Sequence, residues 1–446
     1  MTSAAEQFVS NLNFGAFAKA TELKKRIWFT LGALIIYRLG TYIPLPGIDP
    51  HVLEEIFKQN QGGMLGMFDM FAGGALSRMT IFALNIMPYI SSAIIMQLMT
   101  AVSPQLEALK KEGEAGRKKI NQYTRYGTVL IAALQAYGIS VGLEGMTSSA
   151  GSAVIHPGIF FRFQVVVTLV GGTIFLMWLG EQITARGIGN GTSLIIMSGI
   201  VANLPTALAG TLELGRTGAL STPFIIVLLV MSVAVIFFIV FVERAQRRII
   251  IQYPKRQRGN KMTGGESSHL PLKLNTSGVI PPIFASSILL MPITVIGFSA
   301  GTGPEWLTSM AAYLGRGQPV YLIIYISMVV FFAFFYTAVV FNPVDTADNL
   351  KRYGGFIPGI RPGKNTADYL DWVLTRLTVI GAAYLALICL LPELLISQYS
   401  VPFYFGGTSL LIVVTVTMDT VAQVQSHLLA HQYEGLIKKA KLRGRK

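Results

Sequence analysis

The residues that could take part in chemistry are few, and their spacing does not suit catalysis. His427 and His431 stand one helical turn apart but lack the neighbouring glutamate of a zinc protease motif. The stretch 187–191 (GIGNG) lacks the Lys-Ser/Thr pair of a phosphate-binding loop, so a tight turn is the better interpretation. Cys389 is the only cysteine and cannot form an internal disulfide. We therefore predict a protein that is not an enzyme and holds no metal or cofactor.

Acidic residues lie at the edges of long apolar runs, as at Glu243 and Asp419, and not in their middles. Acids in the middle of a membrane segment are the usual sign of proton or sodium coupling, so a proton-coupled solute carrier is disfavoured. The middles instead hold isoleucines near prolines, such as Ile86 and Ile90 around Pro88, which permits a bend. A ring of such side chains can gate a pore by dewetting, although membrane isoleucines usually only pack.

About ten apolar runs occupy most of the chain, and most are close to the roughly 20 residues that a helix needs to cross a bilayer. Of the 446 residues, 52% are hydrophobic and 13% are charged, which leaves little material for a soluble protein. The runs centre near Ala33, Ile90, Ile131, Leu169, Ile200, Val230, Ser287, Val330, Ala383 and Val413. We predict an all-α, polytopic membrane protein that spans about ten times.

Basic residues gather in alternate gaps between these runs, within a chain of net charge +14. The second, sixth and eighth gaps and both termini are basic, whereas the odd-numbered gaps hold few basic residues. The positive-inside rule places the basic gaps and both termini in the cytoplasm.

Two basic gaps, 243–274 and 342–371, are longer than the usual connection of four to six residues, and we expect them to be docking surfaces. The gap 342–371 places Arg361 between two Pro-Gly turns, where its planar fork of donors suits a carboxylate or phosphate. A solvated arginine that only enforces topology is an equal alternative. The gap 243–274 is basic enough to favour an anionic partner: acidic protein, lipid headgroups or RNA.

The outward stretch 62–74 has glycine pairs at both ends and an apolar core of about ten residues. As a helix, this core reaches about 15 Å, half the thickness of the hydrocarbon layer, so it cannot span. It can re-enter the bundle beside a cavity, or it can rest on the outer surface as an interfacial helix.

Nine ordered stretches resemble the SecY/Sec61 family of protein-conducting channels. They are PLPGI (44–48), GGALSR (73–78), IMPYI (86–90), KKEGE (110–114), QYTRYG (122–127), WLGEQIT (178–184), RGIGNG (186–191), FIPGIRPG (356–363) and PFYFGGTS (402–409). The resemblance covers almost the whole chain. It implies two inverted halves of five spans, residues 1–212 and 213–446, around a central pore with a short re-entrant plug helix.

The resemblance also implies functional residues. A pore ring falls on Ile86, Ile90, Thr192, Ile196, Ile283 and Ile412. A plug from about 64 to 77 includes Met64, Leu65, Met67, Phe68, Met70, Phe71, Gly73, Gly74 and Ser77. A lateral gate between spans two and three and spans seven and eight contains Ser91 and Ser286. Docking sites for the motor ATPase SecA and the ribosome fall on Arg361, Pro362, Gly363, Arg247, Arg248, Lys255, Arg256, Arg258 and Lys261.

Thr192 departs from the family's isoleucine. Its hydroxyl can bind water or the carbonyl four residues back, so we expect a small rise in ion leak at most.

The implied function is a channel in the bacterial cytoplasmic membrane. It translocates signal-bearing unfolded polypeptides and releases transmembrane segments sideways into lipid. The implied partners are the small membrane subunits SecE and SecG, the motor SecA, the ribosome with a possible contact to its RNA, preproteins and lipid. A solute transporter and a membrane insertase that needs no open pore remain the alternatives.

Overall fold

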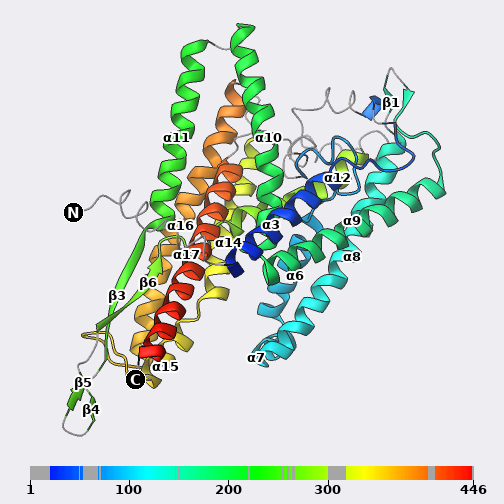
Figure 1. Ribbon diagram of the computed structural model, residues 1–446. Helices are drawn as coiled ribbons and strands as arrows, with labels where there is room; N and C mark the ends of the chain where they lie inside the picture. The colour runs from blue at the N-terminus through cyan, green and yellow to red at the C-terminus, as the bar shows by residue number, and fades with distance from the viewer. Residues whose placement is uncertain are drawn as a thin grey trace.

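The computed structural model describes residues 21–49, 51–53, 69, 72–145, 147–148, 151–218, 221–253, 256–258, 261–263, 267–299, 318–399 and 407–443. Most of them are helical (Figure 1). The helices are α3 (Thr21–Gly40), α6 (Met87–Val102), α7 (Pro104–Lys111), α8 (Glu114–Gly145), α9 (Ile159–Arg186), α10 (Gly191–Arg216), α11 (Thr222–Arg244), α12 (Ile280–Ser299), α14 (Pro319–Val340), α15 (Pro343–Arg352), α16 (Lys364–Tyr399) and α17 (Gly407–Arg443). The strands are β1 (Thr147–Ser148), β2 (Gly151–Ser152), β3 (Gln246–Gln252), β4 (Arg256–Arg258), β5 (Lys261–Thr263) and β6 (Ser267–Lys273).

The helices account for the apolar runs of the sequence. Within the described part of the chain, seven helices are long and apolar enough to cross a membrane: α8, α9, α10, α11, α14, α16 and α17. α6 and the 280–289 part of α12 are shorter apolar helices. Together with α3, these helices lie over the ten predicted runs. The prediction of an all-α polytopic membrane protein is therefore confirmed.

Two helices link the N-terminal and C-terminal parts of the bundle. α12 packs against α6 and α8 as well as its neighbour α14, and α10 packs against both α9 and α17. Figure 1 shows α8 and α9 side by side on the right, α16 and α17 on the left, and α10 and α11 rising together as a green hairpin. The division of the chain at residues 212 and 213 stays a prediction.

A non-helical stretch, which we call the turn segment (residues 73–86), precedes α6. The sequence suggests a helix bent at Pro88, but α6 begins at Met87 and Pro88 lies in its first turn. Proline is tolerated there because the first N–H groups of a helix have no partner within the helix. The turn segment presses closely on α9, since a Cβ atom on Gly172 would overlap the carbonyl oxygen of Ile81.

The basic loops form a second, smaller unit beside the bundle. β3 and β6 pair antiparallel, from Gln246 opposite Lys273 to Gln252 opposite Ser267. Gln252 also exchanges two backbone hydrogen bonds of 2.9 Å with Phe356 in the other long loop. Beneath them lies a cluster of buried side chains: Ile249, Leu272, Ile357, Leu370, Val373, Leu374 and Leu377. The two loops that the sequence treats separately therefore share one core.

Ile249 and Ile250 are adjacent on β3 but point to opposite faces, with exposed fractions of 5% and 48%. Ile249→Ala should destabilise the hairpin by about 2–5 kcal/mol, because it leaves a cavity in the small core. Limited proteolysis between residues 253 and 267 should become faster in that variant. Ile250→Ala is the matched control and should behave as the parent; equal cleavage rates in the two variants would contradict this account of the core.

Candidate functional site

Five of the six predicted ring residues lie in the continuous apolar core. Ile86 stands at the start of α6, and Ile90 in its first turn; the other three lie on α10, α12 and α17. None of the five isoleucines, Ile86, Ile90, Ile196, Ile283 and Ile412, is more than 8% exposed. The helices thus bring apolar side chains from four separate parts of the chain into one core. Their role as a pore ring stays a prediction.

Thr192 uses its side chain to start α10. Its hydroxyl donates to Oδ1 of Asn190 at 2.6 Å, and the same oxygen accepts from the backbone N–H of Thr192 at 3.1 Å. A Cβ atom on Gly180 of α9 would lie 3.4 Å from the Thr192 methyl group. The hydroxyl therefore donates to the N-cap side chain in place of the carbonyl four residues back, and the small rise in ion leak stays a prediction.

A cavity of about 570 Å³ lies next to the isoleucines on the side of the basic loops. Three of its lining residues, Ser193, Ile280 and Thr415, are each three residues from Ile196, Ile283 and Ile412. That spacing is about one helical turn, or roughly 4.5 Å along the axis. The cavity also has many polar lining residues: Asn190, Ser193, Glu243, Lys273, Asn275, Thr276, Ser277, Asp419, Thr420, Gln423 and Ser426. We call it the polar cavity.

The sequence gives only a faint sign of this cavity. Glu243 and Asp419 stand out in the sequence as acids at the edges of apolar runs. Nothing in their spacing indicates that they line the same space, because they lie on α11 and α17.

The turn segment lies on the opposite side of Ile196 from the polar cavity. A Cβ atom on Gly73 would come within 2.8 Å of the Cα atom of Gly199, which is one turn beyond Ile196 on α10. Gly73 also has a positive φ of 67°. α10 therefore passes the polar cavity at Ser193, the isoleucines at Ile196 and the turn segment at Gly199.

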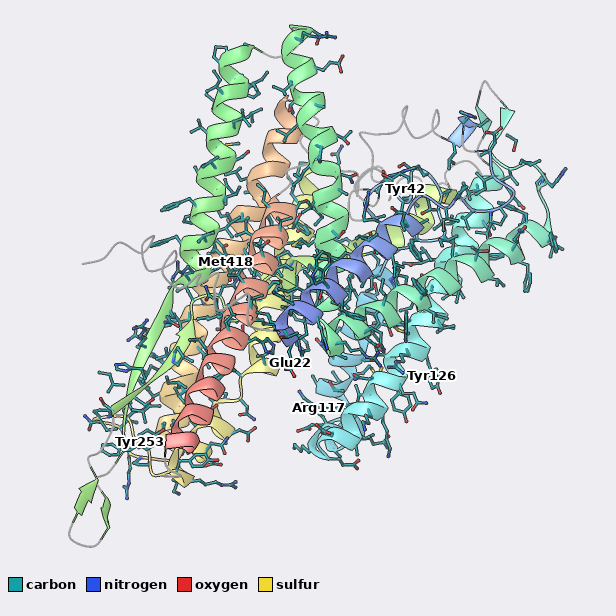
Figure 2. The ribbon with its side chains drawn as sticks, viewed as in Figure 1. Glu22, Tyr42, Arg117, Tyr126, Tyr253 and Met418 are labelled. Carbon is teal, nitrogen blue, oxygen red and sulfur yellow. The ribbon has the colours of Figure 1, made fainter. Side chains whose placement is uncertain are left out.

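Two arginines hold the start of the turn segment. Arg38 of α3 donates to the carbonyl oxygen of Gly73 at 3.2 Å, and Arg78 donates to that of Gly74 at 3.0 Å. The Arg78 guanidinium also lies over the ring of Tyr42, 4.2 Å from its centroid, and lowers the pKa of that phenol. Figure 2 labels Tyr42, which follows the end of α3.

Asp69 also holds the start of the turn segment, by accepting hydrogen bonds from two of its backbone N–H groups. Its Oδ1 accepts from the backbone N–H of Ser77 at 2.7 Å, and its carbonyl oxygen accepts from Gly74 at 3.0 Å. Burial raises the pKa of the Asp69 carboxyl, and the Ser77 hydrogen bonds oppose that rise. Gly73, Gly74 and Ser77 of the predicted plug thus lie in turns. The other predicted plug residues, Met64, Leu65, Met67, Phe68, Met70 and Phe71, lie outside the described residues.

At the position of the predicted lateral gate, α6 packs against α12. Ser91 and Ser286 are both buried, and Ser286 donates to the carbonyl oxygen of Ile283 in its own helix at 2.9 Å. The polar contact between the helices comes from neighbouring residues, since the Ser287 hydroxyl lies 3.6 Å from the sulfur of Met87. The sequence does not distinguish Ser286 from Ser287, because the rotation of α12 decides which one faces α6.

The predicted docking residues gather on the unit of joined loops. Arg247, Arg248, Arg361 and Pro362 are exposed, and Gly363 is half-buried with a φ of 106°. The carbonyl oxygen of Arg361 accepts from the Thr366 hydroxyl at 3.0 Å, which fixes the loop at the start of α16. Lys255 lies outside the described residues. The side chains of Arg256, Arg258 and Lys261 do so too, although their backbones form β4 and β5.

The joined loops pack closely where β3 ends. A Cβ atom on Gly355 would lie 3.0 Å from the ring of Tyr253, which is labelled in Figure 2. A larger residue at position 355 would push the second loop away from the hairpin. The loops that carry the predicted docking arginines therefore belong to one packed unit.

These features define the class: a polytopic helical membrane protein in which core isoleucines separate a polar cavity from a buried turn segment. A family model described as SecY matches residues 80–421. The chain belongs to the SecY family. It is 57% identical to the protein translocase subunit SecY of Escherichia coli K12 over 424 residues, which covers 95% of this chain and 96% of the relative. It is 56% identical to the subunit of Rickettsia typhi, with 95% and 98% covered.

Solved structures share the fold. A structure described as a protein conducting channel has a TM-score of 0.67 at 17% identity, covering 92% of this chain and 93% of the other. Sec61 in the canine ribosome-channel complex has a TM-score of 0.64 at 16% identity, with the same coverage. The resemblance predicted from sequence motifs is thus confirmed.

Gly73→Ala should destabilise the turn segment for two reasons, its positive φ and the lack of space for a methyl group. The positive φ costs about 1–2 kcal/mol, and the added methyl group meets Gly199 and Arg38. We expect a lower midpoint of thermal unfolding and a higher ion conductance in proteoliposomes. Gly359→Ala is the matched control, since Gly359 has a φ of 83° but open space around it. If both variants show the same conductance, the close contact with α10 does not seal the protein.

Proposed function

We infer that this chain forms the protein-conducting channel of a translocase in the bacterial cytoplasmic membrane. Unfolded, signal-bearing polypeptides pass through it, and transmembrane segments leave it sideways into lipid. The order of features along α10 carries this proposal: polar cavity, apolar isoleucines and turn segment follow one another at Ser193, Ile196 and Gly199. A short apolar constriction next to a polar space excludes water and ions, but it can widen when a polypeptide passes through it.

The six ring positions, Thr192 among them, form that constriction in this proposal. Ile86, Ile90, Ile196, Ile283 and Ile412 supply the apolar surface, and Thr192 is the sixth position, with its methyl group near Gly180 of α9. The segment from about 64 to 77 acts as the plug on the outer side. The contact of Gly73 with Gly199 supports this role, because it lies directly beyond the ring.

The lateral gate lies between α6 and α8 on one side and α12 and α14 on the other. Ser91 and Ser286 are the predicted residues of this gate, and the weak contact of Ser287 with Met87 crosses it. A hydroxyl and a thioether make a weak hydrogen bond, which suits a seam that must open. An apolar signal segment that leaves there gains free energy by exchanging water for lipid.

Energy for transport must come from partners in this proposal, because the sequence carries no nucleotide-binding motif. The exposed arginines of the joined loops suit SecA or a ribosome, and a similar solved structure is a ribosome-channel complex. SecE and SecG complete the assembly in the membrane. The positive-inside rule places the joined loops and both termini in the cytoplasm.

A crosslinking experiment tests the channel. Cys389, which is 3% exposed, is replaced by serine, and a single cysteine is placed at Ile86. A stalled preprotein with one cysteine should form a disulfide with it, because the translocating chain occupies the ring. The crosslink should require SecA and ATP. A crosslink to a cysteine at Ser91 without any to Ile86 would instead indicate an insertase that does not pass chains through its centre.

Arg361→Glu should slow motor-driven export by about tenfold or more, because reversing the charge of an interface arginine commonly costs several kcal/mol of binding free energy. The fold should persist, since the side chain is exposed on a loop. Export rates in inverted membrane vesicles give the measurement. Lys351→Glu, at an exposed position near the end of α15, is the charge-matched control. Equal export by both variants would remove the docking role of Arg361.

A further inference from the structure

The polar cavity contains a carboxylate in a preset position. Glu243, in the last turn of α11, is only 8% exposed, and its Oε1 accepts from Nδ2 of Asn275 at 2.7 Å. Asn275 is itself fixed, since its Oδ1 accepts from the Ser277 hydroxyl at 2.9 Å and from the Gly278 N–H at 3.1 Å. Among the described residues, Asn275 is the only side chain that donates to Glu243. Asn275 thus positions one carboxylate oxygen, and the carboxylate retains capacity to accept further hydrogen bonds.

Thr415 provides a second polar group in the same cavity. Its side chain is 5% exposed, and its hydroxyl has no hydrogen-bond partner among the described residues. A buried hydroxyl without a partner is unfavourable, because it has lost its hydrogen bonds to water and gained none in the protein. It lies one turn from Ile412 on α17, so a ligand that satisfies it also sits directly beside the ring.

The charges that line the cavity favour a cation. Its described lining includes two carboxylates, Glu243 and Asp419, and one ammonium, Lys273, which gives a formal charge of −1. No ion pair within the described residues joins Lys273 to either acid. Among the described residues, no group of three or more His, Cys, Asp or Glu side chains could hold a metal ion. An organic cation with several donors fits better than a metal, because it can bond to a carboxylate and a hydroxyl together.

We propose that Glu243, with Thr415 and Asp419, binds an arginine or lysine side chain of the polypeptide that is about to enter the ring. The proposal rests on the channel function above and names a recognition site within it. A guanidinium or ammonium held there stays on the side of the basic loops while the following residues advance past Ile412. The site therefore retains a basic flank in the cytoplasm, and it favours one orientation of a signal segment.

A crosslinking ratio tests the site. In membrane vesicles that hold the intact translocase, the channel carries Cys389→Ser and one cysteine at Ser193, which lines the cavity. Two stalled preproteins carry one cysteine each, next to either an arginine or a glutamine in an otherwise uncharged flank. In the parent channel, the arginine flank should crosslink about threefold more than the glutamine flank. In Glu243→Gln, this ratio should fall to about one.

Control variants separate binding from structure. Glu243→Asp keeps the charge and should restore part of the ratio, and Thr415→Val should lower it while keeping the shape of the side chain. Glu213→Gln removes an exposed acid at the other end of α10 and should leave the ratio unchanged. The same preproteins are also tested against a cysteine at Ile86. Suppose that the crosslink to the Ile86 cysteine persists and the ratio of arginine-flank to glutamine-flank crosslinking at Ser193 is equal in the parent and Glu243→Gln. The cation site alone is then wrong. If the crosslink to the Ile86 cysteine is absent in the parent, the proposed channel function is wrong as well.

Discussion

The structure depends on one constraint: backbone polar groups within a membrane must find partners in the protein, because hydrocarbon offers none. Helices meet this condition by themselves, but the turn segment does not. Its backbone is satisfied partly by its own turns, as where the N–H of Thr80 donates to Ala75 at 2.9 Å. The chain after α3 supplies further partners, since the N–H of Leu45 donates to Met79 at 2.8 Å and that of Ile81 donates to Ile43 at 3.1 Å. Arg38 and Arg78 supply the remaining donors at the glycines. The non-helical piece can therefore exist only where α3, α9 and α10 enclose it.

The same constraint explains the change of chemistry along α10. Its first turn is polar, since Asn190 caps the helix and binds the Thr192 hydroxyl. One turn later the helix is apolar at Ile196, and a further turn on, Gly199 allows the turn segment to approach. A polar side chain is tolerated at the helix start because it satisfies groups that the helix leaves unpaired. Three successive turns of α10 therefore contact the polar cavity, the apolar core and the turn segment.

The joined loops show how two distant loops become one rigid unit. Gln252 and Phe356 are about one hundred positions apart, yet they exchange two backbone hydrogen bonds. The buried cluster beneath them includes Ile249 from the hairpin and Ile357 from the second loop. Both loops therefore share this core with α16, which packs against α14 and α17 in the bundle.

The sequence by itself determined the apolar runs and the family, and it predicts the sides on which the loops lie. These depend on hydropathy, charge and short motifs, which are properties of consecutive residues. Only the tertiary structure decided that α6 begins at Met87, that Ser287 and not Ser286 contacts Met87, and that Thr192 bonds to Asn190. It alone showed the polar cavity, where Glu243 meets Asn275 32 positions away. The physical reason is that such contacts depend on the rotation and depth of each helix, and an apolar run has nearly the same hydropathy whichever way it is turned.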